Sequence, residues 1–237
     1  MLALLFVVAG CGGDDGDEAG PTTPTSGTTL PTSGTTSTST AAAPCGAEGV
    51  QAVTLRTPEG AEVDAALVGE GETGVVLGHQ FRSDFCSWVP FAEELARRDM
   101  AALAVNFASA SLDDEMVAGA NELLERGAKR IFLVGASMGG TAALVAAEQL
   151  DVAGVAAVSA PGEFSGLDAL AAVRELDTRA LFLAGRQDGE FARDARRLYR
   201  ATSSRDKALI MIAGFEHGTD LLRDPKAERA LLAFLAE

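Results

Sequence analysis

The sequence predicts an α/β fold in which a mostly parallel sheet of about eight strands is covered by helices on both faces. Short apolar runs alternate with helical stretches from residue 46 to residue 237. Most of these runs are continuously apolar, as expected of strands that are buried on both faces. With 237 residues, 47% of them hydrophobic, the chain can bury one sizeable core.

The elements can be assigned in order along the chain. A hairpin comes first, because two β-rich runs flank the turn residues Pro58, Glu59 and Gly60. Strands are predicted at residues 51–57, 62–68, 74–79, 101–107, 130–136, 152–161, 179–185 and 207–214. Helices are predicted at residues 90–98, 112–128, 138–150, 167–176, 191–202 and 226–237.

The chain begins with a short apolar run that precedes a cysteine. The run MLALLFVVAG is too short to cross a bilayer, which takes about 20 apolar residues. Val8, Ala9 and Gly10 precede Cys11, and this stretch resembles the end of a bacterial lipoprotein signal. The resemblance implies a signal at residues 1–11 with a lipidated Cys11, and an extracytoplasmic lipoprotein anchored to the bacterial cell membrane. A chance cysteine after an apolar N-terminus is the alternative.

The next segment, residues 12–45, consists almost entirely of Gly, Ser, Thr, Pro, Ala and acidic residues. It cannot bury enough apolar surface to fold, which predicts a disordered linker. The folded domain is then residues 46–237. In an exported protein Cys45 and Cys86 are candidates for a disulfide, and two free buried thiols are the alternative.

The charge and the ligand-type residues exclude several functions. A formal net charge of −15 argues against a nucleic-acid partner and would repel polyanionic substrates. His, Cys and Asp residues do not cluster at metal-ligand spacing, so neither a metal nor an organic cofactor is predicted. The sequence carries no signal for an oligomeric state.

Three polar residues come just after predicted strands, where the carboxyl ends of a parallel sheet form its active edge. They are Ser137, Asp188 and His217. A serine hydroxyl becomes a good nucleophile when an imidazole takes its proton, and a carboxylate fixes the tautomer of that imidazole. The sequence therefore predicts a Ser-His-Asp triad, with Glu190 as a nearby alternative carboxylate.

The surroundings of Ser137 favour this chemistry. Gly135 and Gly139 flank it where a buried strand turns into a helix, and glycine leaves room for the crowded backbone of such a turn. The turn places Ser137 at a helix N-terminus, where partial positive charge favours a developing oxyanion. The Met138 N–H is the predicted first oxyanion donor.

These residues and their order resemble those of the α/β-hydrolase family. GASMG (135–139) fits the family's G-x-S-x-G motif, and Ser137, Asp188 and His217 follow its chain order of serine, acid and histidine. GRQD (185–188) resembles the acid-bearing loop, and EHG (216–218) resembles the histidine loop. The resemblance covers residues 50–237.

The resemblance also extends to GHQF (78–81), which stands in the place of the family's H-G-x oxyanion loop. It implies the Phe81 N–H as the second oxyanion donor and His79 as a support of the loop through hydrogen bonds. Gln80 stands where the family usually has glycine, so the sequence departs from the pattern there.

These observations favour a serine hydrolase that cleaves a carboxylic ester or related acyl bond in a small-molecule acyl substrate. A peptidase or a dienelactone-hydrolase-like enzyme on the same fold is one alternative, although the latter typically has cysteine in the place of Ser137. A catalytically impaired cell-surface binding lipoprotein is another. Residues 161–179 are predicted to lie over the site, and this stretch is too short for a large lid domain.

Overall fold

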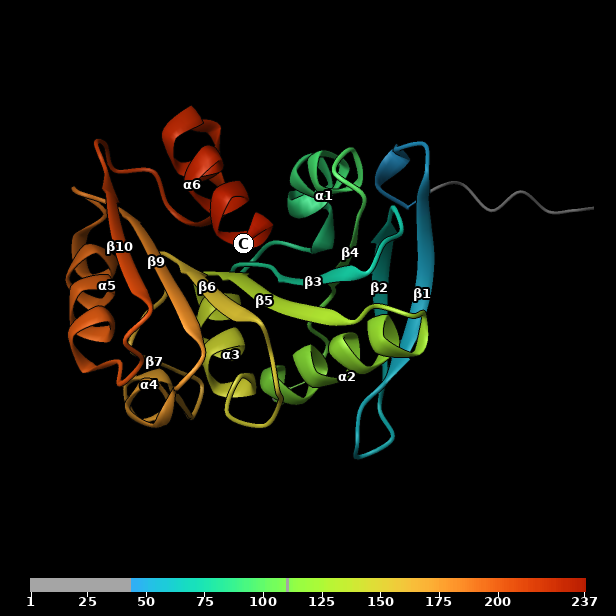
Figure 1. Ribbon diagram of the computed structural model, residues 1–237, viewed down its shortest axis with the longest axis horizontal. Helices are drawn as coiled ribbons and strands as arrows, with labels where there is room; N and C mark the ends of the chain where they lie inside the picture. The colour runs from blue at the N-terminus through green and yellow to red at the C-terminus, as the bar shows by residue number, and fades with distance from the viewer. Residues whose placement is uncertain (1–43, 110) are drawn as a thin grey trace, which may run out of the picture. The chain divides into compact units, whose positions relative to one another are not determined.

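The computed structural model describes residues 44–109 and 111–237 (Figure 1). The predicted signal, the Cys11 lipidation site and nearly all of the predicted linker lie outside the described residues. Within the described part, the chain from residue 44 onward forms one α/β unit built on a single large sheet.

The large sheet has eight strands, as the sequence predicts. They are β1 (Val50–Arg56), β2 (Glu62–Val68), β3 (Thr73–Gly78), β4 (Met100–Val105), β5 (Arg130–Ala136), β6 (Gly154–Val158), β9 (Arg179–Gly185) and β10 (Lys207–Ile212). Their order across the sheet is β1-β2-β4-β3-β5-β6-β9-β10. Within this sheet only the β1–β2 and β2–β4 pairs are antiparallel, so the predicted mostly parallel sheet is confirmed.

Helices cover both faces of this sheet (Figure 1). The α-helices are α1 (Val89–Ala96), α2 (Leu112–Glu125), α3 (Met138–Ala146), α4 (Ala169–Glu175), α5 (Gly189–Ala201) and α6 (Pro225–Ala236). Short 3-10 helices are η1 (Pro44–Gly46), η2 (Phe85–Trp88) and η3 (Gly218–Arg223). One core lies between the sheet and α2 to α5, and a second lies between the sheet and α1 and α6.

The continuous apolar strands of the sequence explain these two cores. Successive side chains of a strand point to opposite faces, so a strand between two helix layers must be apolar throughout. In β4, for example, Leu103 packs in the core with α2, whereas Ala102 and Ala104 pack in the core with α1. All six residues of β4 are buried.

The stretch after β6 differs from the predicted run of strand and helix. The strand ends at Val158, and a two-stranded hairpin of β7 (Glu163–Phe164) and β8 (Leu167–Asp168) precedes α4. The helix begins after Asp168 because that side chain accepts a hydrogen bond from the Ala171 N–H, at 2.9 Å, as an N-cap does. The predicted helix at residues 167–176 is therefore shorter at its start.

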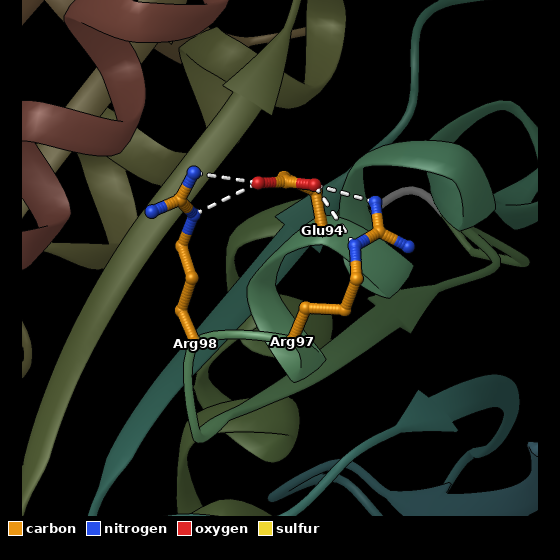
Figure 2. Close-up of polar contacts among 3 residues, drawn as sticks. All are labelled: Glu94, Arg97 and Arg98. Atoms are coloured by element: carbon orange, nitrogen blue, oxygen red, sulfur yellow. Dashed lines mark hydrogen bonds and ion pairs between the residues drawn. The ribbon is translucent and has the colours of Figure 1, made fainter.

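On the other face, α1 ends in a compact charged group (Figure 2). The Glu94 carboxylate accepts hydrogen bonds from the Nε atoms of Arg97 and Arg98, each at 3.0 Å. These hydrogen bonds from two guanidinium groups hold the pKa of Glu94 below its ordinary value. The group lies at the surface with both arginines exposed, so its contribution to stability is small.

A disulfide joins the start of the described chain to the segment that follows β3. Cys45 in η1 and Cys86 in η2 are bonded, with Cα atoms 5.4 Å apart. The adjacent Trp88 is fully buried and donates from its indole N–H to the Gly78 carbonyl at 2.9 Å. The disulfide thus fastens the segment that packs against the end of β3. Within the described ranges no helix is long and apolar enough to cross a membrane.

We expect the Cys45→Ser/Cys86→Ser double variant to unfold at lower denaturant concentration than the oxidised protein. The bonded cysteines are separated by 41 residues. The entropy of closing such a loop in the unfolded chain corresponds to about 4 kcal/mol, and measured losses are often smaller, so we expect about 2–4 kcal/mol. Guanidinium unfolding followed by circular dichroism measures the difference. Wild-type protein reduced with dithiothreitol is the control and should match the variant; equal midpoints for variant and oxidised protein would contradict the expectation.

Candidate active site

The carboxyl ends of β3, β5, β9 and β10 lead into the loops that form one pocket of about 640 Å³. Ser137, His217, Gln80 and Phe81 line this pocket. The structure therefore brings together four residues that the sequence predicts for the site, although they come from loops far apart in the chain. Met138 follows Ser137 directly, as the first residue of α3.

Ser137 alone separates β5 from α3, which makes this a sharp turn. Its φ is 51°, in a region that residues with a side chain rarely adopt. The backbone around it holds this conformation: the Ser137 N–H donates to the Val158 carbonyl at 2.8 Å, and the Ser137 carbonyl accepts from Gly140 at 2.9 Å. A strained residue held by its surroundings is typical of a functional position.

The flanking glycines are required by close backbone packing. A Cβ on Gly135 would lie 2.0 Å from the Gly139 carbonyl oxygen. A Cβ on Gly139 would lie 2.3 Å from the Gly78 carbonyl oxygen, at the end of the neighbouring strand β3. Without side chains at these positions, the start of α3 packs directly against the end of β3.

Asp188 and His217 form a pair at the edge of the pocket. The Nδ1 atom of His217 lies 3.0 and 3.2 Å from the two carboxylate oxygens of Asp188. Because the carboxylate accepts, Nδ1 carries the proton, and Nε2 is left with a lone pair that can act as a base. Asp188 is 8% exposed, and the Phe191 ring packs on the imidazole at a centroid distance of 4.2 Å. Glu190, the alternative carboxylate, lines the pocket and is exposed.

Ser137, Asp188 and His217 share a further property: each is the N-cap residue of a helix, and none caps it with its side chain. Ser111 before α2 does not cap its helix either, whereas the aspartates that precede η2, α4 and α6 all accept a backbone N–H as N-caps do. The three side chains are thus available for contacts outside their own helices.

Among the described residues, hydrogen bonds join His217 to Asp188 but none joins His217 to the Ser137 hydroxyl. The two residues nevertheless line the same pocket. Catalytic hydrogen bonds without substrate are often long and tighten when the substrate binds. The pocket thus holds a serine and an imidazole that is oriented by a carboxylate.

The two amides predicted as oxyanion donors have no acceptor within the described part of the chain. Neither the Phe81 N–H nor the Met138 N–H donates a hydrogen bond there. For Met138 this follows from its position, since the first N–H groups of a helix have no acceptor within the helix. Both groups can therefore donate to an oxygen atom bound near Ser137.

His79 holds the peptide that contains the Phe81 amide. The buried imidazole accepts from the Phe107 N–H at Nε2, at 3.1 Å, so Nδ1 carries the proton and donates to the Gln80 carbonyl at 2.8 Å. In a trans peptide the carbonyl and the next N–H point in opposite directions. Fixing the Gln80 carbonyl on His79 therefore turns the Phe81 N–H away from that ring.

Burial of His79 has an electrostatic consequence. It lowers the pKa of the imidazole below the ordinary value of 6.5, and the hydrogen bond to the Gln80 carbonyl and the carboxylates of Asp84 and Glu115 only partly oppose this. The neutral ring is also the form that its two hydrogen bonds require, since Nε2 must accept.

The side chain of Gln80, the residue that departs from the family pattern, points toward the histidine loop. Its Oε1 atom accepts from the backbone N–H of Thr219 at 2.8 Å and from the Thr219 hydroxyl at 3.1 Å. Thr219 lies two residues after His217. The sequence contains no signal that joins these two loops.

Glu115, like Thr219, is a residue of this network that the sequence analysis missed. Its carboxylate is 0% exposed and accepts from the N–H groups of Ala108 and Ser109, the latter at 2.7 Å. It therefore holds the loop after β4, which supplies the Phe107 N–H to His79. A signal was present, because Glu115 lies one turn from Leu112 and Gly119 on the apolar face of α2.

The hairpin of β7 and β8 also lines the pocket. Phe164 lies with its ring centroid 6.1 Å from that of Phe81. Asp194 of α5 accepts from the Gly162 N–H at 3.0 Å and from Arg197 at 2.8 Å, which fixes the start of this segment. Part of the stretch predicted to lie over the site thus lines the pocket.

In the described part of the chain, no three His, Cys, Asp or Glu residues are grouped so that they could hold a metal ion. At the pocket the chain brings together the Ser137 hydroxyl, the His217 imidazole with its carboxylate, and two backbone N–H groups, a set that could serve acyl transfer.

Comparison with known proteins gives likenesses in structure only. No family model matches the sequence, and no curated protein matches it. An esterase from Pyrococcus furiosus is 15% identical, with a TM-score of 0.68 over 79% of this chain and 91% of that chain. A dienelactone hydrolase from Anabaena variabilis is 21% identical, with a TM-score of 0.65 over 78% of this chain and 94% of that chain.

An esterase from Exiguobacterium antarcticum is also similar, with 12% identity and a TM-score of 0.64 over 79% of this chain and 100% of that chain. At identities this low the likeness establishes the fold and leaves the activity to be argued from the site. Together with the mostly parallel eight-stranded sheet, it shows that the chain has the α/β-hydrolase fold.

We expect the stabilising contribution of His79 to be lost in acid. Because its pKa is lowered by folding, the unfolded chain takes up this proton at higher pH than the folded protein. The contribution is therefore complete above about pH 6.5 and falls as the pH falls below it. Urea unfolding of wild type and His79→Gln at pH 8 and pH 5 tests this, and the difference in unfolding free energy should narrow at pH 5.

Trp88→Phe is the matched control, because it removes the indole donor to Gly78 beside the same loop and introduces no titrating group. Its difference from wild type should be the same at both pH values. A difference for His79→Gln that stays constant or widens in acid would contradict the lowered pKa.

Proposed function

We propose that the protein is a serine hydrolase that cleaves a carboxylic ester or a related acyl bond. The proposal is carried by one observation: Ser137 lies on a strained turn in the same pocket as the Asp188–His217 pair. Among the described residues, the N–H of Met138, which follows Ser137, and the N–H of Phe81, which lines the same pocket, have no acceptor. The structural likeness to two esterases and a dienelactone hydrolase supports a hydrolase on this fold.

In the first half of the proposed reaction, the Ser137 hydroxyl oxygen attacks the carbonyl carbon of the substrate. His217 Nε2 takes the hydroxyl proton, and the Asp188 carboxylate stabilises the imidazolium that forms. The carbonyl oxygen becomes an oxyanion and accepts from the Phe81 and Met138 N–H groups. The tetrahedral intermediate then collapses, and His217 gives its proton to the leaving alcohol.

In the second half, water attacks the acyl-enzyme ester on Ser137. His217 takes a proton from this water, the same two N–H groups stabilise the second oxyanion, and the acid product leaves as the proton returns to the Ser137 oxygen. In both steps of this reaction His217 carries the proton, and the Phe81 and Met138 N–H groups stabilise the oxyanion.

The pocket supports a substrate of moderate size. Its volume of about 640 Å³ lies within the usual range for small-molecule sites. Phe81, Phe164 and Leu170 supply apolar surface, which suits an alkyl or aryl group. Glu163 and Glu190 stand exposed at the same pocket and disfavour anionic substrates.

We expect Ser137→Ala to abolish labelling by a fluorophosphonate and to abolish hydrolysis of p-nitrophenyl esters. His217→Ala should lower kcat/KM by on the order of 10⁴ or more, as loss of a triad member does. His79→Ala should lower kcat/KM by about 10²–10³, because the base remains and one oxyanion donor is misplaced. A series of p-nitrophenyl esters of increasing chain length measures these effects and the acyl preference.

His79→Ala should also keep some fluorophosphonate labelling of Ser137, and this result distinguishes the role of His79 from that of His217. Hydrolysis by Ser137→Ala at the wild-type rate would overturn the proposed mechanism. A wild-type protein that neither reacts with the fluorophosphonate nor hydrolyses any ester in the series would instead support the binding lipoprotein.

We also propose that the protein is a lipoprotein anchored to the outer surface of a bacterial cell membrane through Cys11. The small and aliphatic residues before Cys11 support this, as does the acidic, Ser/Thr-rich stretch after it. The Cys45–Cys86 disulfide supports an oxidising compartment, where such bonds form and persist.

We expect mass spectrometry of protein extracted from the membranes of a bacterial expression host to show a lipidated cysteine, Cys11, at the N-terminus. Cys11→Ser should appear in the soluble fraction without the lipid mass, because the thiol is the acceptor. Recovery of the wild-type chain unmodified and beginning at Met1 would contradict the lipid anchor.

A further inference from the structure

The backbone that carries His217 begins a helix whose cap comes from elsewhere. His217 is the N-cap residue of η3, and its ring contacts Asp188 instead of the helix. The first N–H groups of a helix need acceptors from outside it. For Thr219, in the first turn of η3, this acceptor is the side-chain oxygen of Gln80, at 2.8 Å.

The fit between Gln80 and this turn is close. The same Oε1 atom accepts from the Thr219 hydroxyl at 3.1 Å. Gly218 has a φ of 59°, and a Cβ on it would lie 2.2 Å from Gln80 Oε1. The carboxamide therefore occupies the space that a side chain at 218 would take, directly beside the residue that follows His217.

Gln80 is held at both ends. Its backbone carbonyl accepts from His79 Nδ1 at 2.8 Å, which orients the peptide that carries the Phe81 N–H. Its side chain holds the backbone next to His217. One residue thus connects the loop of an oxyanion donor to the loop of the general base, and both loops line the pocket.

We propose that Gln80 is a positioning residue that fixes His217 relative to the Phe81 amide by capping η3 across the pocket. The inference rests on the proposed function, because it assigns Gln80 a role in that reaction. Transfer of the Ser137 proton requires the imidazole to be placed to within a fraction of an ångström, and a misplacement of about 1 Å can lower the rate about 10²-fold.

The test compares Gln80→Met, which keeps the length of the side chain but lacks the accepting oxygen, with Gln80→Glu, which keeps an oxygen that can accept both hydrogen bonds. Gln51→Met is the matched control, because Gln51 is an exposed residue of β1, on the first strand of the sheet. Thr219→Val removes the hydroxyl donor and leaves the 2.8 Å bond from the Thr219 N–H.

The first readout is the imidazole NMR spectrum of the full chain. The sequence has only two histidines, so the signals of His217 and His79 can be assigned by single substitutions. In Gln80→Met we expect the His217 signals to shift or broaden, because the loop loses its cap. In Gln80→Glu, Thr219→Val and Gln51→Met they should stay close to their wild-type positions. A merely structural role would lower stability and leave the His217 signals of the folded protein unchanged.

The second readout is hydrolysis of p-nitrophenyl butyrate. Gln80→Met should lower kcat about 10- to 100-fold and change KM less than about 3-fold, because the reacting groups are misplaced while the pocket persists. Gln80→Glu should restore most of kcat, and Thr219→Val should lower it less than Gln80→Met. Thermal unfolding of each variant shows that the measured protein is folded.

The inference is overturned if the His217 signals of Gln80→Met match those of wild type, or if they shift while kcat does not change. Failure of the proposed function looks different: wild type would neither hydrolyse the ester nor react with a fluorophosphonate. The NMR comparison would even then decide whether Gln80 holds the His217 loop, and an unchanged spectrum would overturn that as well.

Discussion

Close packing of backbone against backbone, between the end of β3 and the start of α3, is the constraint on which the rest of the site depends. The Gly139 Cα approaches the Gly78 and His79 carbonyls so closely that a Cβ would lie 2.3 and 2.7 Å from them. This contact sets Ser137 and the Met138 N–H beside the loop of residues 79–81. The Trp88 indole fixes the same Gly78 carbonyl from the other side, at 2.9 Å. The distance between Ser137 and the loop of residues 79–81 is therefore determined by main-chain atoms, which cannot move away as a side chain can.

Around that contact, some side chains are free of backbone hydrogen bonds, and others accept hydrogen bonds from the backbone. Ser137, Asp188 and His217 begin helices without capping them, so their side chains can face one another or the pocket. Side chains from other segments accept the hydrogen bonds of the free backbone N–H groups near the site. Gln80 accepts from the first turn of η3, while Glu115 and His79 satisfy N–H groups of the loop after β4. Buried polar groups that are all paired form a rigid network, which favours a fixed orientation of the Phe81 N–H.

The sequence was sufficient to predict the order of strands and helices and the residues at the carboxyl edge of the sheet, because both follow from local patterns. A serine between glycines at a strand–helix junction, and an acid and a histidine after later strands, are local features. The features of the site that the sequence did not predict depend on contacts between distant segments. Gln80 and Thr219 are 139 residues apart, and nothing near either one indicates the other. The strands of the β7–β8 hairpin have only two residues each, too few to show a period. Glu115 could have been found, since a carboxylate on an apolar helix face requires buried partners.

The departure of Gln80 from the family's glycine is best understood together with Gly218. A glycine at position 80 would leave the Thr219 N–H without its side-chain acceptor, and it would leave open space beside Gly218. With glutamine at position 80, any Cβ at 218 would collide with the carboxamide, at 2.2 Å. The two residues fit together: a long side chain on one loop fills the space left by the missing side chain on the other, and the φ of 59° at Gly218 also favours glycine there. The backbone of the loop is not altered by the glutamine. His79 binds the Gln80 carbonyl, and the Phe81 N–H has no acceptor among the described residues. These contacts keep the loop of residues 79–81 ordered, and they support the proposed hydrolase over the catalytically impaired binding protein.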